Sequence, residues 1–116
     1  PKDDITVLEK PSIMLYEAGI PKWGVRSNTG HLLQQKTIKL EGSVIVVPLS
    51  PQGGDFSLTT DSLNIDLVSQ IADTNDKVVI ESDRSELLAT GMTILLDQQF
   101  VKFKSQVRGR HDPKAQ

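Results

Sequence analysis

The chain has 116 residues and a formal net charge of −2, and 37% of its residues are hydrophobic but only 4% aromatic. This length suffices for one domain with a modest core. The apolar residues are mostly Val, Ile and Leu, which favours strands over a helical bundle. The chain has no cysteine, which excludes a disulfide framework and thiolate metal sites. It also lacks a run of about 18 apolar residues, so the sequence itself contains no predicted membrane helix.

Short alternating segments predict strands along most of the chain. Residues 43–47 are apolar at nearly every position, so both faces of that segment are expected to be covered. A hairpin turn is expected at Ala72–Asp76. We predict an all-β, antiparallel, jellyroll-like open sandwich of stacked hairpins with about eight or nine strands. In chain order the strand-like segments are Ile5–Leu8, Ile13–Tyr16, Trp23–Ser27, Thr37–Gly42, Ser43–Val47, Ser62–Leu67, Lys77–Glu81, Met92–Leu96 and Phe100–Val107.

A similar short segment recurs around three threonines, Thr29, Thr60 and Thr90, which are 31 and 30 residues apart. Each threonine is followed by an alternating run, a turn and a second strand-like run. A nearly constant period indicates that one supersecondary unit is stacked on itself. The alternation indicates that the unit is a pair of strands, and a stack of such pairs has open ends where partners can attach.

Charge is distributed unevenly along the sequence. From Lys102 to Gln116 there are five Lys and Arg residues and one acidic residue, against eight and fourteen in the remainder. A basic end of this kind suits an anionic lipid, an acidic protein surface or a nucleic acid. Too few aromatic residues are present to stack on bases, which argues against a nucleic-acid partner. Residues 110–116 equally suit a basic, disordered tail beyond a domain formed by residues 1–109.

Chemistry-bearing motifs are missing from the sequence. The two histidines, His31 and His111, are far apart and have no carboxylate at metal-ligand spacing. Asp73 and Asp76 suit a turn better than a calcium loop. No serine lies in a Gly-x-Ser-x-Gly motif, and no Gly-rich phosphate loop is present. We therefore expect a binding protein with no catalytic residue, metal or cofactor, and not an enzyme.

Several runs together resemble the LptC family of lipopolysaccharide export. They are Lys10-Pro11, Ile20–Arg26, Ile38–Val46, Thr60-Asp61 with Ile65–Val68, Thr90–Met92 and Gln106–Gly109. The resemblance spans residues 8–109, nearly the whole chain, and its specificity comes from the order of these runs. It implies a twisted, boat-like β-jellyroll in the periplasm, whose apolar groove carries the acyl chains of lipopolysaccharide.

The resemblance also implies partners. The first strands of such a domain meet an inner-membrane ABC transporter, and its last strands join a periplasmic bridge protein of similar fold. An inner-membrane helix and the opening strands of the jellyroll are expected upstream, because the sequence starts at Pro1 without them. The function implied is non-enzymatic transfer of lipopolysaccharide from the transporter to the next bridge protein. The alternative is a structural adaptor that joins proteins by strand-edge pairing without carrying lipid.

Alternation and the resemblance together select candidate site residues. Gln106, Val107 and Arg108 match the terminal segment of the family and are expected to contact the next bridge protein. Trp23, at a strand start beside Gly24, is expected to anchor the packing at one end of the sheet. The residues expected to line the lipid-binding groove are Leu15, Leu40, Val44, Val46, Ile65, Leu67, Ile80, Ile94, Leu96, Val101 and Phe103.

Overall fold

A computed structural model describes residues 5–49, 56–83, 85–105 and, for their backbone, 108–111. These residues form one antiparallel sheet of ten strands, which confirms the predicted all-β, open jellyroll-like class. A 3-10 turn, η2 (Leu96–Gln98), joins β8 to β9. The strands are β1 (Ile5–Glu9), β2 (Ser12–Glu17), β3 (Ile20–Arg26), β4 (Thr29–Leu33), β5 (Thr37–Pro48), β6 (Phe56–Asp66), β7 (Ile71–Ser82), β8 (Ser85–Leu95), β9 (Phe100–Phe103) and β10 (Arg108–His111).

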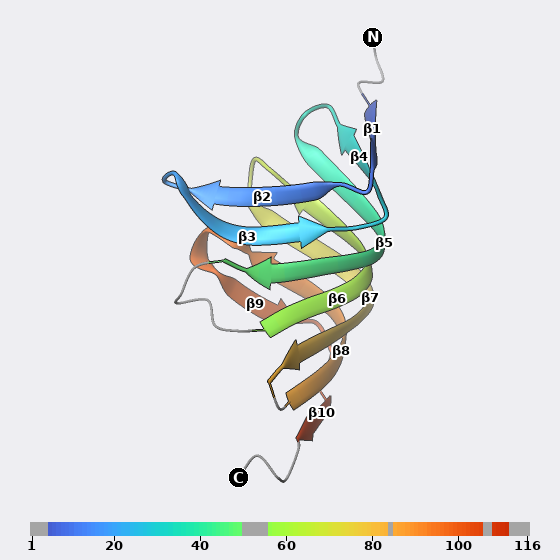
Figure 1. The fold of residues 1–116 in the computed structure, drawn as a ribbon, viewed down its shortest axis with the longest axis vertical. Helices are drawn as coiled ribbons and strands as arrows, with labels where there is room; N and C mark the ends of the chain where they lie inside the picture. Colours follow the sequence, from blue (N-terminus) through green and yellow to red (C-terminus); the bar gives the residue numbers. More distant parts are fainter. Residues whose placement is uncertain (1–4, 50–55, 84, 106–107, 112–116) are drawn as a thin grey trace.

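Each of the four long strands, β5 to β8, bends near its middle, where the pairing register shifts. The shorter strands take the place of the two halves of a bent strand. β1 and β2 pair with β4 and β3 respectively, and β4 and β3 pair with the two halves of β5. At the other end, β9 and β10 pair with the two halves of β8. The sheet is therefore a stack of bent strands along an axis of 57 Å (Figure 1).

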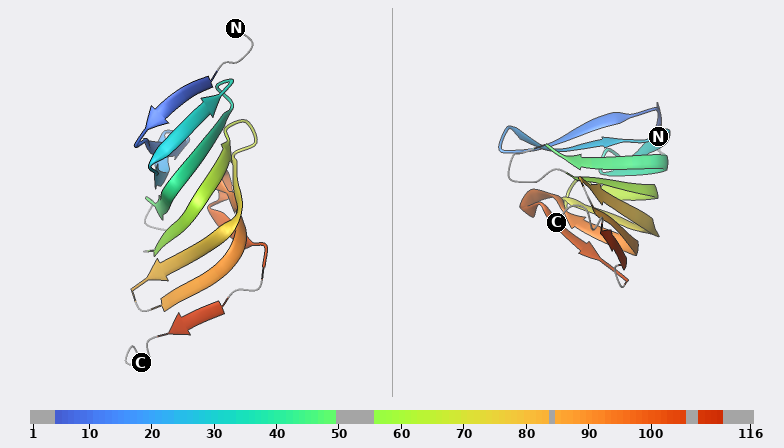
Figure 2. Two further views of the ribbon diagram at one scale, coloured as in Figure 1. Left: turned by 90° about the vertical axis from the view of Figure 1, so that its right-hand side faces the viewer. Right: turned by 60° about the horizontal axis from the view of Figure 1, so that its bottom comes forward.

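The bends divide the sheet into two layers that face each other. The first layer contains β2, β3, β10 and residues 44–48, 56–60, 77–82 and 85–90 of the long strands. The second layer contains β1, β4, β9 and residues 37–41, 62–66, 71–74 and 92–95. The layers are continuous through the bends on one side and end in hairpin tips on the other. Figure 2 shows the stacked strands from two further directions.

The bends explain the spacing of the three threonines. Thr29 begins β4 directly after the break from β3, while Thr60 and Thr90 lie at the bends of β6 and β8. All three therefore lie at the bend of every second strand, and the period of about 30 residues is one hairpin of two bent strands. Threonine suits this place because its hydroxyl can bond to a backbone group that the shifted register leaves without a ladder partner. The Thr60 hydroxyl donates to the carbonyl oxygen of Lys77 at 2.8 Å.

Two local predictions were wrong, the first because of a bend and the second because residues 44–47 alternate between the two faces of the sheet. Ala72–Asp76 is not a hairpin turn but lies inside β7, where the backbone N–H of Asp76 donates to Thr74 Oγ1 at 3.1 Å. Asx and Thr side chains form such local bonds in bulges as well as in turns. Residues 43–47 are not covered on both faces, because Val44 and Val46 are buried while Ile45 and Val47 are only half-buried on the outer face.

The predicted last strand, Phe100–Val107, is shorter in the described residues, because β9 ends at Phe103 and a separate strand, β10, begins at Arg108. β10 continues through Arg110 and His111, which pair with Glu86 and Ser85. These two residues belong to the range predicted as a tail. Residues 112–116 of that range lie outside the described part of the chain.

The turn between β6 and β7 is held by the carboxylate of Asp66. Its Oδ1 accepts hydrogen bonds from the backbone N–H groups of Val68, at 2.9 Å, and Ser69, at 3.1 Å. The bond from Ser69 and then that from Val68 lower the pKa of Asp66, because both favour the charged carboxylate.

Replacing this carboxylate should make stability depend less on pH. A lowered pKa adds stability that is present above the unfolded-state pKa of about 3.9 and is lost as the pH falls through the folded-state value. We therefore expect Asp66→Ala to lower the midpoint of urea unfolding at pH 7 and to change it less at pH 2.5. An equal loss at both pH values would contradict this role of the charge.

A second prediction concerns the bend of β5. Gly42 has a φ of +82°, and a Cβ at this position would lie 2.8 Å from the side-chain nitrogen of Asn28. Gly19 has a similar φ of +79°, but no atom lies within 4 Å of its Cβ position. Gly19→Ala should therefore cost about 1–2 kcal/mol of unfolding free energy from backbone strain alone. Gly42→Ala should cost about 1–3 kcal/mol more from crowding, measured by urea unfolding. Equal costs would show that Asn28 moves aside freely.

Candidate functional site

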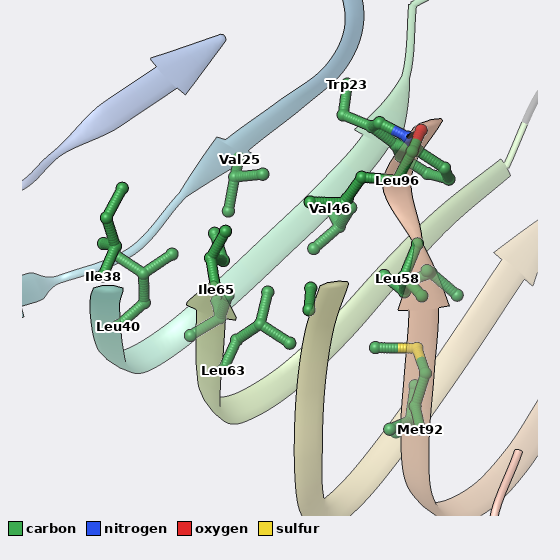
Figure 3. Close-up of a cluster of buried hydrophobic side chains, with 14 of the residues drawn as sticks. Trp23, Val25, Ile38, Leu40, Val46, Leu58, Leu63, Ile65, Met92 and Leu96 are labelled. Atoms are coloured by element: carbon green, nitrogen blue, oxygen red, sulfur yellow. Dashed lines mark hydrogen bonds between the residues drawn. The ribbon is translucent and has the colours of Figure 1, made fainter. Parts of the chain in front are cut away.

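The candidate site is the apolar interior between the two layers. Alternation directs every second side chain of each strand half into this space, and the opposite layer covers it. Figure 3 shows side chains from both layers, such as Val46 and Leu63, pointing into one cluster. The buried members, each at most 8% exposed, are Trp23, Val25, Ile38, Leu40, Val44, Val46, Leu58, Leu63, Ile65, Ala72, Val78, Ile80, Met92, Ile94 and Leu96.

The structure brings all eleven predicted groove residues into this one interior cluster. Those that are fully buried are Leu40, Val44, Val46, Ile65, Ile80, Ile94 and Leu96. Those that are partly buried and pack against the cluster are Leu15, Leu67, Val101 and Phe103. The predicted groove residues therefore share one location, with the partly buried ones at its margin.

The predicted groove residues leave out several interior residues, among them Leu58, Leu63 and Met92. Alternation does place Leu63 on the same face as Ile65, and Met92 on the same face as Ile94. Leu58 and Leu63 are five positions apart, so a strict two-residue period cannot place both on the inner face. The extra residues at the Thr60–Asn64 register shift change the phase and turn both side chains inward. The sequence signal for this change of phase is Thr60, because the repeat places it at the same position as Thr29 and Thr90, where the strands bend or break.

The polar groups beside the interior are paired. Thr60 and Thr74 are buried at the bends, and no buried side-chain nitrogen or oxygen lacks a partner in the part of the chain that the structure describes. Lys104 forms an ion pair with Asp73, whose Oδ1 lies 2.9 Å from Lys104 Nζ, and it donates to Asn75 Oδ1 at 2.7 Å. The interior is therefore lined by apolar groups, and the charge of Lys104 is already engaged at the outer surface of a bend.

Metal-binding geometry is absent from the described residues, where no group of three or more His, Cys, Asp or Glu side chains converges. His31 lies in β4 within the second layer. Asp73 and Asp76 form part of the hydrogen bonding at a bend, in which Asp73 Oδ1 accepts from Thr93 Oγ1 at 2.8 Å and Asp76 bonds to the Ser62 hydroxyl. No helix in the described part of the chain is long and apolar enough to cross a bilayer.

Trp23 connects the layers at the side opposite the bends. Its side chain is 1% exposed, and its indole N–H donates to the carbonyl oxygen of Leu96 in η2 at 3.1 Å (Figure 3). Beside it, Gln99 Nε2 donates to the carbonyl oxygen of Lys22 at 3.3 Å. Burial agrees with the expectation that Trp23 anchors the packing, and the hydrogen bond adds a link between layers that the sequence did not predict.

The two ends of the stack are strands with one neighbour each. Among the described residues, β1 and β2 pair only with β4 and β3, and β9 and β10 pair only with β8. On β1 the outward-facing Ile5 and Val7 are 52% and 65% exposed. Of the residues predicted to bind a partner, Arg108 begins β10 and pairs with Leu88. Gln106 and Val107 lie outside the described residues.

An elongated sheet, folded into two layers around an apolar interior and ending on both sides in strands that pair with one described neighbour, defines a β-jellyroll-like protein suited to an apolar ligand. The chain matches a family model described as "Lipopolysaccharide-assembly, LptC-related" over residues 1–112. It therefore belongs to the LptC-related family and takes part in lipopolysaccharide transport, as a periplasmic bridge protein that binds lipid. A search of curated proteins found no match.

The packing role of Trp23 has a measurable consequence. Trp23→Ala removes a fully buried ring and leaves the Leu96 carbonyl oxygen without its donor. We expect a loss of about 3–5 kcal/mol in the free energy of unfolding, as for other truncations of large buried side chains. Urea denaturation followed by far-UV circular dichroism measures this loss. An unchanged unfolding curve would mean that the ring is exposed in solution.

Proposed function

We propose that this protein carries the acyl chains of lipopolysaccharide between the two layers of its sheet. In this proposal it receives lipopolysaccharide from an inner-membrane ABC transporter and passes it to a periplasmic bridge protein of similar fold. The observation that carries the proposal is the interior, which is apolar throughout and runs along the stack. The LptC-related family membership supports the identity of the cargo.

The composition of the interior favours an acyl chain over a polar ligand. Aliphatic side chains from both layers supply nearly all of its surface, with Trp23 and the half-buried Phe56 and Phe103 as its aromatic members. Each methylene that moves from water into such surroundings gains about 0.8 kcal/mol. Several acyl chains would therefore bind strongly without any directional contact, while the polar headgroup would have to remain outside.

The unpaired edges at the two ends support transfer between neighbours. A strand with one free edge can extend its sheet into the sheet of another protein through backbone hydrogen bonds. If β1 and β2 face the transporter, then β9 and β10 face the next bridge protein, and the interiors of neighbouring proteins would join end to end. Arg108 begins β10 at this second edge, and Gln106, Val107 and Arg108 remain the proposed contact residues.

Two further elements complete the proposal. The energy for transfer would come from the transporter, because the protein itself is proposed to act without catalysis. An inner-membrane helix outside the present sequence would hold the domain near the transporter. The family likeness supports this anchor.

Photo-crosslinking tests whether lipid occupies the interior. Phe100 and Phe103 lie on the same strand, but Phe103 packs against the core while Phe100 faces outward and is 53% exposed. A photo-reactive phenylalanine analogue at Phe103 should label bound lipopolysaccharide strongly. The same analogue at Phe100 should label it only at background level.

The contradicting result needs more than one inward position. If analogues at Leu67, Val101 and Phe103 all fail to label while the folded protein is saturated with lipopolysaccharide, the lipid does not bind between the layers. The unpaired edges would then favour an adaptor that joins proteins by strand pairing without carrying lipid.

A further inference from the structure

The two long sides of the interior are closed in different ways. On one side, the strands run from layer to layer through the bends, so the closure is covalent and is reinforced by backbone bonds such as Asn28 N–H to Gly42 O at 2.8 Å. On the opposite side the layers end in hairpin tips (Figure 1). Among the described residues, β3 contacts η2 across this side. Any separation of the layers must therefore pivot at the bends and open at the tips.

The contact of β3 with η2 is small, and η2 is hydrogen-bonded to both layers. From the first layer, the Trp23 indole N–H donates to the Leu96 carbonyl oxygen. The Lys22 carbonyl oxygen accepts a hydrogen bond from Gln99 Nε2. From the second layer, the carbonyl oxygen of Gln70, in the turn between β6 and β7, accepts from the Leu96 backbone N–H at 3.0 Å. η2 is thus a short bridge between the tips, and Trp23 is its main link to the first layer.

Room for a ligand requires this bridge to move. The interior side chains are at most 8% exposed and pack against one another, so the space between the layers is filled by the protein itself. Along the two long sides of the interior, an acyl chain can enter only where the layers part, and the bends cannot part without breaking strands.

We propose that acyl chains pass into the interior between β3 and η2, and that Trp23 is the closure of this portal. The proposal rests on the function proposed above and adds the place and the residue at which loading is controlled. In the closed state the Trp23 ring fills the space beside Leu96. When the layers part, the apolar face of the ring remains at the rim, where it can contact a passing acyl chain.

The interactions of Trp23 that close the portal are weak enough to break and re-form. A buried hydrogen bond between neutral groups contributes modestly to stability, because opening exchanges it for bonds to water. Losing it should shift an opening equilibrium by no more than about tenfold. A closure made of one such bond and one packed ring is therefore weaker than the bonded strands on the side of the bends.

The sequence is well suited to a direct test, because it contains no cysteine. Lys22→Cys with Gln99→Cys places thiols on both sides of the portal, where the Lys22 carbonyl oxygen and Gln99 Nε2 already lie 3.3 Å apart. A short, cleavable thiol-reactive linker would then lock the portal. Ser12→Cys with Arg26→Cys is the matched control, because these exposed residues pair across β2 and β3 within the first layer.

The probe is purified lipid A, and native mass spectrometry measures the fraction of protein that has gained its mass. Locking Lys22→Cys/Gln99→Cys should reduce loading at least tenfold, and cleaving the linker should restore it. The linked Ser12→Cys/Arg26→Cys protein should load like the unmodified chain. Circular dichroism confirms that each linked protein is folded before it is compared.

A second variant tests the closure without a linker. Trp23→Phe keeps an aromatic ring but removes the indole N–H, so the closed state loses its bond to Leu96. The initial rate of lipid A loading should rise between two- and tenfold. A slower rate in a folded Trp23→Phe protein would contradict a closing role for this bond.

The outcomes separate this inference from the proposed function. If the locked portal loads lipid A as fast as the control, lipid enters elsewhere and the portal is wrong, while the carrier function stands. If the unmodified chain gains no lipid A mass under conditions in which it is folded, the carrier function fails and the portal fails with it.

Discussion

The shared bend of the strands is the constraint on which the rest of the structure depends. Neighbouring strands must bend at matching positions along their length. A strand that ran straight would lie in one layer only and would leave the inner face of the other layer uncovered. Residues with special backbone or side-chain properties meet this demand at Gly42, Thr60 and Gly91. A single sheet thereby forms two facing layers, and an apolar interior arises without a second sheet.

The same constraint makes the two sides of the interior unequal. The strands themselves hold the layers together at the bends, so any separation of the layers would pivot on this side. The hairpin tips are joined by side-chain contacts, in which Trp23 and Leu96 have the central part. A protein that must hold a lipid and then release it needs one firm side and one that opens. This inequality connects the packing of the domain with lipopolysaccharide transport in the LptC-related family.

The sequence predicted the fold class and the buried faces of several strands, because alternation reports which face of a strand is buried, but it predicted no strand at β4 and only the second halves of β6 and β8. Ile65, Ile94 and Phe103 were selected on this ground, and all of them lie in or against the interior cluster. Alternation failed at the bends, where extra residues change the phase, so Leu58 was missed and a bend in β7 was taken for a hairpin turn. The hydrogen bond from Trp23 to Leu96 joins residues 73 positions apart, and no local pattern predicts such a pair.

The most direct test of an acyl chain between the layers is a solution NMR measurement on protein with labelled Ile, Leu and Val methyl groups. Intermolecular nuclear Overhauser effects from lipid A methylenes identify the methyl groups that touch the acyl chains. The account predicts contacts to Val44, Ile65 and Ile94, each of which is 0% exposed without lipid. Contacts confined to outward-facing methyl groups, such as those of Ile45 and the 43% exposed Leu88, would contradict it.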